Sequence, residues 1–325
     1  MTTLATVAPT TVARGTKAIR VAYGEALAEL GGERPDLVVL DADLAHATTT
    51  CVFADQYPDR FFNLGIAEQN MMGVAAGLAI SGFTPVASTF SMFGTGRAFE
   101  QVRNSICYPG LNVTLALSHN GLTVGEDGGS HQAVEDIALM RALPGMTILV
   151  PCDAIEMRKA LRAAIDIPGP VYIRVSRPPA PIFTDDEAPF IPGRANRLRS
   201  GGDVTIVATG LMVYQSSLAA DLLAGDGIQA TVLNMHTIKP IDREAIILAA
   251  ARTGRLVTVE DHSIIGGLGS AVAEVLSTDY PARLKRIGLQ DCFGQSGTPD
   301  ALADHYGLTA PHIASTVRAF LGEGR

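Results

Sequence analysis

The sequence predicts an α/β protein of two domains, each with a parallel sheet covered by helices on both faces. Short apolar runs typical of buried strands alternate with segments of helical period along most of the 325 residues. The stretch 178–202 interrupts this alternation with five prolines, and the alternation resumes after it. We therefore expect a flexible arm at 1–16, a first domain at 17–177, a linker at 178–202 and a second domain at 203–325.

In the first domain, the predicted strands are short apolar runs, and the predicted helices have apolar residues at helical spacing. The helix at 66–82 ends at a glycine, a common helix terminator. The expected strands lie at 37–44, 84–89, 112–119, 146–151 and 171–176. The other expected helices lie at 97–108, 133–143 and 153–165.

The second domain repeats this order of strands and helices, which again favours a parallel sheet. Its expected strands lie at 204–209, 228–235, 255–261 and 284–290. Three helices are expected to begin at Met212, Asp242 and Gly266, and two closing helices lie around 298–307 and 310–322.

The composition excludes several classes of protein. Apolar residues make up 47% and charged residues 18%, which is typical of a well-packed globular chain. The net charge is −8 and no basic cluster occurs, so neither nucleic acid nor a membrane surface is an expected partner. No apolar run approaches the roughly 18 residues that span a bilayer. The four cysteines are isolated and form no CxxC, which favours a reduced, cytoplasmic compartment.

Two short glycine patterns carry little functional signal. "GGLGS" at 266–270 lacks the full GxGxxG spacing of a dinucleotide loop and also fits the start of a helix. "GDG" at 225–227 fits a helix end followed by a turn. The sequence contains no P-loop, no GxSxG, no HExxH and no Cys/His metal spacing.

The loop "SHNGLTVGEDGGSHQAVED" (118–136) is the strongest candidate for a functional site. It follows a strand, so it lies at the edge where a parallel sheet binds ligands. It combines His119, Glu126, Asp127 and His131 with four glycines, which allow unusual backbone conformations and close approach of a ligand. The alternative is a solvated loop in which Ser130 caps a helix beginning near Ala133. Two histidines and two acids exceed what capping requires.

Several longer stretches resemble the transketolase family of thiamine-diphosphate enzymes. They are "FNLGIAEQNMMGVAAGLAISGFTPVASTF", "SHNGLTVGEDGGSHQAVEDIALMRALPGMTILVPCD", "HTIKPID" and "VTVEDHSIIGGLGSAVAEVL". More narrowly, residues 16–325 resemble the C-terminal half of transketolase as it occurs when the enzyme is split into two polypeptides. The resemblance implies a pyrimidine-binding domain followed by a transketolase C-terminal domain.

Glu68 is the one carboxylate in the apolar stretch "FFNLGIAEQNMM" (61–72), so it needs a partner. In the resembling family, a glutamate at this position hydrogen-bonds N1′ of the aminopyrimidine of thiamine diphosphate. An apolar setting raises the pKa of a carboxyl group, which keeps a proton available to share with N1′. The cofactor then serves as electron sink for the substrate carbanion. The alternative for Glu68 alone is a carboxylate on a helix surface.

Two phenylalanines, Phe90 and Phe93, match the family's aromatics that pack on the pyrimidine. Their spacing of three also fits ordinary core packing on one helix face. Gly96 stands where many transketolases have another aromatic, so we expect a pyrimidine pocket of somewhat different shape.

The resemblance also implies substrate contacts. Arg20, His119 and Arg177 match the residues that hold the sugar phosphate, and a guanidinium offers phosphate a planar fork of donors. Asp127 matches the residue that contacts the donor's C2 hydroxyl, and His131 the residue near the reacting C1 and C3 oxygens.

Two departures weaken a prediction of the natural sugar. Ala47 replaces a phosphate-binding serine, and Asn120 replaces an aspartate.

The chain lacks the GDG followed by Asn about 25–30 residues later that holds the diphosphate and its cation in this family. The resemblance therefore implies an N-terminal partner subunit that carries this motif and binds a divalent cation such as Mg²⁺, in an α2β2 assembly. This chain itself is expected to bind no metal. The small residues of "NMMGVAAGLAIS" (70–81) fit either that subunit interface or internal helix packing.

We expect a transferase: the C-terminal subunit of a transketolase that moves a two-carbon ketol (glycolaldehyde) unit from a ketose phosphate to an aldose phosphate. Glu68, His119 and His131 are its expected catalytic residues. One alternative is a β-type subunit of a 2-oxoacid dehydrogenase or an enzyme like deoxyxylulose-phosphate synthase. Another is a non-catalytic interaction module. The sequence does not distinguish the pentose phosphate route from catabolism of a rarer sugar.

Overall fold

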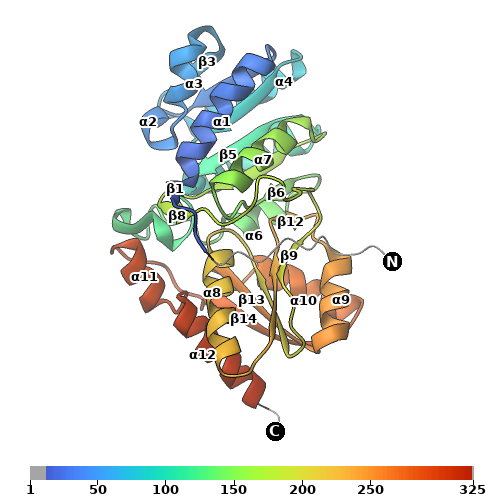
Figure 1. The fold of residues 1–325 in the computed structure, drawn as a ribbon. Coiled ribbons are helices and arrows are strands. Elements are labelled where there is room, and N and C mark those ends of the chain that lie inside the picture. The colour runs from blue at the N-terminus through green and yellow to red at the C-terminus, as the bar shows by residue number, and fades with distance from the viewer. Residues whose placement is uncertain (1–11, 324–325) are drawn as a thin grey trace.

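The computed structural model describes residues 12–323, which form two α/β domains with mostly parallel sheets (Figure 1). The expected fold class is therefore confirmed. Residues 1–11 of the expected N-terminal arm lie outside the described residues. Within residues 12–323, no helix combines the length and the apolar character that crossing a membrane requires.

The first domain contains a seven-stranded sheet with strand order β12-β6-β7-β5-β4-β2-β3. In this sheet, the six strands that precede residue 178 all pair in parallel, so their carboxyl ends meet at one edge. These strands are β2 (Leu37–Asp41), β3 (Phe61–Asn63), β4 (Thr84–Ser88), β5 (Thr114–Ser118), β6 (Thr147–Leu149) and β7 (Val171–Val175). β12 (Thr237–Lys239), from the second half of the chain, pairs antiparallel with β6.

Helices cover both faces of this sheet, so its central strands are apolar on both sides. Val39 of β2 packs in the core formed with α1 (Ile19–Glu33) and α7 (Ala154–Asp166). The next residue, Leu40, packs on the opposite face in the core that includes α4 (Glu68–Ile80). Three short helical segments join β2 to β3: α2 (Ala45–Thr48), α3 (Cys51–Gln56) and η1 (Pro58–Arg60).

The segment between β4 and β5 differs from the single helix expected at 97–108. It consists of a π-helical turn η2 (Phe93–Arg97), a short α5 (Phe99–Gln101) and a second π-helical turn η3 (Val102–Cys107). A π-helical turn changes the direction in which the following side chains point, and such turns are frequent at functional sites. Arg97 is the last residue of the first turn.

The helix expected at 133–143 is also shorter, spanning only α6 (Asp136–Arg141). The reason is that Ala133 continues the sheet edge instead: it forms an isolated bridge with Asn120, and its carbonyl accepts a hydrogen bond from Gly121. Ser130 therefore does not cap a helix at Ala133, contrary to the alternative considered above. Its hydroxyl contacts the ring of His131.

The second domain contains a five-stranded sheet with strand order β14-β13-β10-β11-β9. All of its pairings are parallel except that of the edge strand β9. Its strands are β9 (Asn196–Arg199), β10 (Val204–Ala208), β11 (Ala230–Asn234), β13 (Arg255–Ser263) and β14 (Arg283–Leu289). Its helices are α8 (Met212–Gly225), α9 (Arg243–Thr253), α10 (Leu268–Thr278), α11 (Pro299–His305) and α12 (Ala310–Gly322), with α8 and α12 on the side opposite to α9 and α10 (Figure 1).

The proline-rich stretch 178–202 contains two short strands. β8 (Pro179–Pro181) pairs antiparallel with β1 (Thr16–Ala18), and β9 is an edge strand of the second sheet. Strands of three or four residues are too short to show a period, which explains why the sequence analysis did not identify them.

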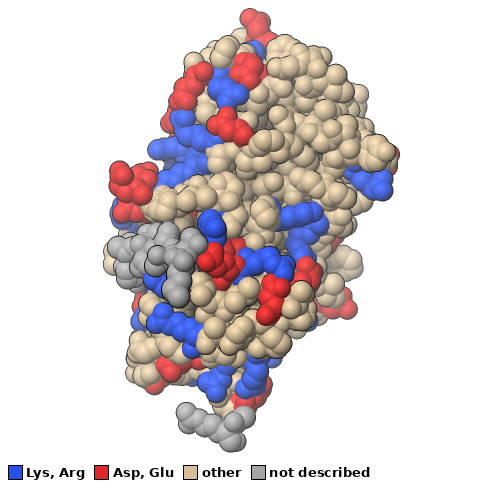
Figure 2. Space-filling model, turned by 90° about the vertical axis from the view of Figure 1, so that its right-hand side faces the viewer, with Lys and Arg blue, Asp and Glu red and all other residues tan. Residues whose placement is uncertain are grey.

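The two domains share one hydrophobic core, in which Met146 and Ile148 of the first domain join Met235, Ile238 and Leu268 of the second. On the face drawn in Figure 2, acidic and basic side chains intermix, and a broad area of the upper part, which belongs to the first domain, carries few charges. No continuous basic surface is visible on this face.

Candidate active site

Glu68 is the first residue of α4, and its side chain is only 2% exposed. Both of its carboxylate oxygens accept hydrogen bonds from Nη1 of Arg97, at 3.1 and 3.0 Å. The surface-carboxylate alternative is therefore wrong, and the partner that a buried Glu68 requires is Arg97. A half-exposed arginine, 51% accessible, compensates the buried charge.

Arg97 was not identified from the sequence. Its Cζ atom lies 4.8 Å from the centre of the Phe93 ring, a cation–π contact. Arg97 lies four residues after Phe93, a spacing that makes two side chains neighbours on a helix but does not distinguish this arginine from others on a helix surface.

Phe90 and Phe93 lie together with both loop histidines. The ring of His119 stacks on Phe90 with a centroid distance of 3.8 Å and an interplanar angle of 21°. Phe90 and Phe93 stack at 5.8 Å, and His131 meets the Phe93 ring edge-on at 5.4 Å. The structure thus brings four of the sequence-predicted residues into one cluster: Phe90, Phe93, His119 and His131. Arg97 links Glu68 to this cluster, because it contacts both Glu68 and Phe93.

His119 follows β5 directly, at the carboxyl edge of the sheet, and has a positive φ of 58°. The ring is buried, and its Nδ1 lies 2.9 Å from the Ser118 hydroxyl. Burial, and to a lesser extent the charges of Arg177, Arg20 and His131, together lower the pKa of His119 to about 3. The imidazole is therefore neutral at physiological pH and offers one donor and one acceptor.

Arg20 and Arg177 lie side by side at the same edge of the sheet. Nε of Arg20 donates to the Arg177 carbonyl at 3.3 Å, and its Nη1 donates to the Ala47 carbonyl at 2.8 Å. Burial, and then the charge of Arg177, lowers the pKa of Arg20. Two guanidinium groups beside a neutral histidine favour an anion, which would relieve their mutual repulsion.

Three further residues of the loop, Glu126, Asp127 and Asn120, have different surroundings. Arg177 donates to the Val124 carbonyl and lies 3.3 Å from the Glu126 carboxylate, which neutralises part of its charge. Asp127 is exposed at the end of the 3-10 segment η4 (Leu122–Asp127). The Asn120 side chain accepts from Ser176 at 3.2 Å, but within the described residues its buried Nδ2 has no acceptor.

The second domain holds the GEDG loop in place. Asp261 of β13 accepts hydrogen bonds from the Leu122 amide at 2.9 Å and the Thr123 hydroxyl at 3.1 Å. Gln132 donates to the carbonyls of Leu122 and Gly125 in the loop and of Gln295 in the second domain. Neither set of hydrogen bonds was expected from the sequence. Leu122 and Asp261 are 139 positions apart, and Gln132 and Gln295 are 163 positions apart.

The glycines of this loop adopt the unusual backbone conformations that were expected. Gly121, Gly125 and Gly128 have φ values of 67°, 85° and 76°, which favour glycine. They also let the second domain approach closely: a Cβ on Gly121 would lie 2.2 Å from the Asp261 carboxylate, and one on Gly128 would lie 2.5 Å from the Ser296 hydroxyl.

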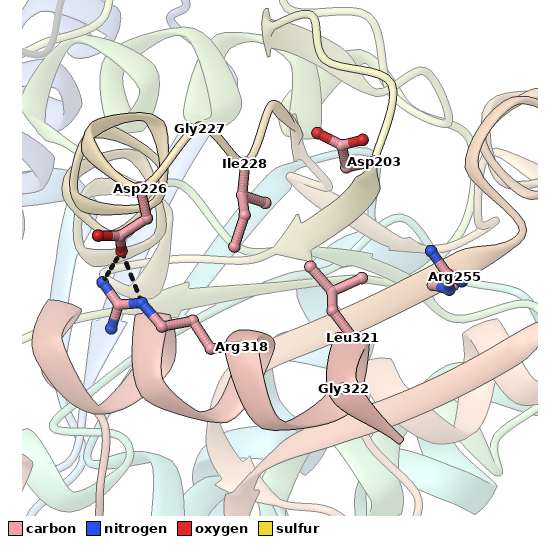
Figure 3. A pocket seen from close by; sticks show the side chains of 8 residues that line it. All are labelled: Asp203, Asp226, Gly227, Ile228, Arg255, Arg318, Leu321 and Gly322. Atoms are coloured by element: carbon pink, nitrogen blue, oxygen red, sulfur yellow. Dashed lines mark hydrogen bonds and ion pairs between the residues drawn. The ribbon is translucent and has the colours of Figure 1, made fainter. Parts of the chain in front are cut away.

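The two weaker glycine patterns lie away from this cluster. The amides of Leu268 and Gly269 donate to the buried carboxylate of Glu260 at 2.6 and 2.8 Å, so the amino terminus of α10 already holds an anion of its own chain. The GDG pattern ends α8, with Gly227 at φ 81°. Its Asp226 is bonded to Arg318 (Figure 3), and both residues line a cavity of about 430 Å³.

The chemistry of these residues suits a flat heterocycle. The aromatic faces of Phe90 and Phe93 supply a stacking surface, and the buried Glu68 carboxylate supplies a partner for a ring nitrogen. Within residues 12–323, no group of three or more His, Cys, Asp or Glu side chains is arranged to hold a metal ion.

Comparison with known domain families gives two matches. Residues 16–181 match the family described as the transketolase pyrimidine binding domain. Residues 193–313 match the transketolase C-terminal domain.

Similar proteins agree with this result. The chain is 48% identical over 304 residues to a putative transketolase C-terminal section from Methanocaldococcus jannaschii, covering 93% of this chain and 95% of that protein. It is 46% identical over 295 residues to a 6-deoxy-6-sulfo-D-fructose transketolase subunit from Clostridium sp. (strain MSTE9), covering 91% and 92%. It is also 41% identical over 303 residues to a 1-deoxy-D-xylulose-5-phosphate synthase from Geobacter sulfurreducens, covering 92% of this chain but 47% of that enzyme.

Among solved structures, the chain resembles a split gene transketolase described as an inactive β4 tetramer. The TM-score is 0.87 with 51% sequence identity, and the match covers 96% of this chain and all of the other. The chain therefore belongs to the transketolase family, in which it corresponds to the pyrimidine-binding and C-terminal domains of the enzyme as they occur in split-gene members.

Proposed function

We propose that the chain is the C-terminal subunit of a two-component transketolase, which transfers a two-carbon ketol unit from a ketose phosphate to an aldose phosphate. The observation that carries this proposal is the buried Glu68 carboxylate beside the stacked rings of Phe90, Phe93 and His119. These residues fit the aminopyrimidine of thiamine diphosphate, with Glu68 at N1′ and the phenylalanines against the ring. When bound, the cofactor supplies an electron sink for the substrate carbon.

The role proposed for each side chain comes from the family resemblance, and its surroundings in the structure support it. Glu68 shares a proton with N1′ from a site that bulk water does not reach. His119, neutral because of its lowered pKa, hydrogen-bonds the substrate without adding a charge. His131, whose ring meets Phe93 edge-on, exchanges a proton with the oxygens on the reacting carbons.

The remaining roles concern substrate binding. Arg20 and Arg177 hold the anionic end of the sugar at the carboxyl edge of the sheet. Asp127, exposed at the end of η4, selects the donor through its C2 hydroxyl. The orphaned Nδ2 of Asn120 is a buried donor where the family has an aspartate, and it suits a substrate oxygen.

We further propose an N-terminal partner subunit that binds the diphosphate and a divalent cation such as Mg²⁺, in an α2β2 assembly. The β4 relative is described as inactive, which supports a requirement for a second chain. One face of α4 is available for it: Gly73 and Gly77 are exposed, and a Cβ built on either would meet no atom within 4 Å. Ile66 and Ile80, at the two ends of this face, are 77% and 74% exposed.

The relative from Geobacter sulfurreducens supports a second candidate, a reaction like that of deoxyxylulose-phosphate synthase. That reaction, like a 2-oxoacid dehydrogenase reaction, begins with pyruvate or another 2-oxoacid rather than a ketose. The sulfofructose relative shows that the family also handles sugars outside the pentose phosphate route, so the donor is left open.

The test is to purify the chain with an N-terminal chain from the same genome that carries the GDG–Asn pattern. The complex is then assayed with ketose phosphates and, separately, with pyruvate, each with an aldose phosphate acceptor. We expect ketol transfer from a ketose phosphate and no decarboxylation of pyruvate. Turnover with pyruvate as the donor, and none with a ketose phosphate, would favour the synthase-like reaction. A complex that is inactive and binds no cofactor would favour a non-catalytic module.

A further inference from the structure

Arg97 is a charged residue in the cluster that the proposed reaction does not use. Its guanidinium covers both surfaces that the cofactor's pyrimidine needs. Nη1 donates to both oxygens of Glu68, at 3.1 and 3.0 Å, and Cζ lies 4.8 Å from the centre of the Phe93 ring.

A guanidinium can imitate an aminopyrimidine in these two contacts. Both groups are planar and delocalised, both stack on aromatic rings, and both hydrogen-bond a carboxyl group through a nitrogen atom. The two groups therefore compete for the same carboxylate and the same ring face. The guanidinium and the aminopyrimidine therefore cannot occupy Glu68 and Phe93 at the same time.

The surroundings of Arg97 allow it to leave. Its side chain is half exposed, and within residues 12–323 the Glu68 carboxylate is its only hydrogen-bond partner. It ends the π-helical turn η2, which also contains Gly94 and Gly96. The Glu68 side chain, in contrast, is buried at the start of α4, so Glu68 stays in place when Arg97 swings into solvent.

The ion pair has a clear benefit for the free subunit. A buried carboxylate without a partner is costly, and removing one member of such a pair leaves the other uncompensated. Arg97 keeps Glu68 oriented and paired while the site holds no cofactor.

We propose that Arg97 is a stand-in for the aminopyrimidine: it occupies Glu68 and Phe93 in the free subunit and is displaced when thiamine diphosphate binds. This inference rests on the proposed function, because it requires that the cofactor bind at Glu68. It makes two predictions of opposite sign. Replacing Arg97 destabilises the free subunit, and the same replacement strengthens cofactor binding.

The test compares Arg97→Met with wild type in two measurements. The melting temperature of the isolated chain reports the ion pair without any cofactor. The dissociation constant of thiamine diphosphate with Mg²⁺, measured by calorimetry on the complex with the N-terminal subunit, reports the competition. We expect a lower melting temperature and about tenfold tighter binding, since a hydrogen bond to a charged group contributes on that order.

Two further variants complete the test. Arg103→Met changes an exposed arginine in the neighbouring turn η3, and we expect neither quantity to change. Arg97→Lys keeps the charge but loses the planar fork, so binding should be intermediate; it also serves as the second variant if Arg97→Met fails to fold.

The outcomes separate the two proposals. Unchanged or weaker cofactor binding in both Arg97 variants overturns the stand-in role while leaving the enzyme's identity intact. A wild-type complex that binds no thiamine diphosphate overturns the proposed function itself, whatever the melting temperatures show.

Discussion

The Asp261 carboxylate, on β13 of the second domain, accepts a hydrogen bond from the backbone amide of Leu122 at 2.9 Å. The same carboxylate accepts from the Thr123 hydroxyl, so the start of the GEDG loop is held by a residue far along the chain. This contact gives the second domain a direct part in shaping the site: it fixes the loop that carries Asp127 and leads to His131.

We predict that Asp261→Ala loosens this loop. The Leu122 amide and Thr123 hydroxyl lose a buried acceptor, so hydrogen exchange at residues 121–128 should become faster. Turnover in the reconstituted complex should fall by about tenfold, since misplaced contact residues lose rate steeply. Asp55→Ala, at an exposed position of α3, is the matched control. If hydrogen exchange at residues 121–128 is unchanged in Asp261→Ala, Asp261 does not hold this loop in place.

A second prediction concerns the backbone of the same loop. Gly121→Ala adds a Cβ at a φ of 67° and within 2.2 Å of the Asp261 carboxylate. We expect the free energy of unfolding to fall by about 1–3 kcal/mol from backbone strain alone, with more from the clash. Urea denaturation measures this change. Gly225→Ala, at the exposed end of α8 with no atom within 4 Å of a Cβ, should cost much less.

The exposed glycines of α4 lead to a prediction about assembly. Gly73→Leu places a bulky side chain on a face that no part of residues 12–323 covers, so the isolated chain should fold normally. Binding of the N-terminal partner should weaken if this face is the interface, as measured by size-exclusion chromatography of mixtures. Ser277→Leu, on an exposed position of α10, is the control. Equal binding by both variants would exclude α4 from the interface.

His119 provides a prediction about pH. Its pKa in the folded chain is about 3, below the ordinary value of 6.5, because burial and nearby arginines disfavour the charged form. The unfolded chain therefore takes up this proton first as the pH falls. The contribution of His119 to stability is fully present above pH 6.5 and is lost progressively between pH 6.5 and about 3.

The measurement is the NMR shift of the His119 ring, assigned with a His119→Gln variant. We expect no titration between pH 8 and 5, although acid unfolding of the chain sets a lower limit to the range. A midpoint near the ordinary histidine value would show that the ring is solvated rather than buried.

Much of the fold could be predicted because each central strand is a continuous apolar run. Examples are "LVVLD" at Leu37–Asp41 and "VTIVA" at Val204–Ala208, both buried at every residue. The strands β8, β9 and β12 were missed because three or four residues carry no measurable period. The helix expected at 97–108 was disrupted by π-helical turns, which leave no simple pattern in the sequence.

The candidate site shows the same division. His119 and His131 could be placed near each other because one glycine-rich loop follows a strand end, and the structure joins them through Phe90 and Phe93. Arg97 and Asp261 could not be predicted. The first depends on the geometry of a π-helical turn, and the second on how two domains pack. The roles of the individual site residues remain predictions.

The most direct test of the account is the turnover of Glu68→Ala in the reconstituted two-chain complex. Glu68 lies buried at the start of α4, away from the exposed glycine face, so we expect assembly to be unchanged. Turnover should fall by at least about a hundredfold, the lower range for losing a proton-sharing group. Glu100→Ala, an exposed acid on α5, should retain wild-type activity. Undiminished turnover by an intact Glu68→Ala complex would contradict the role of Glu68 and with it the proposed reaction.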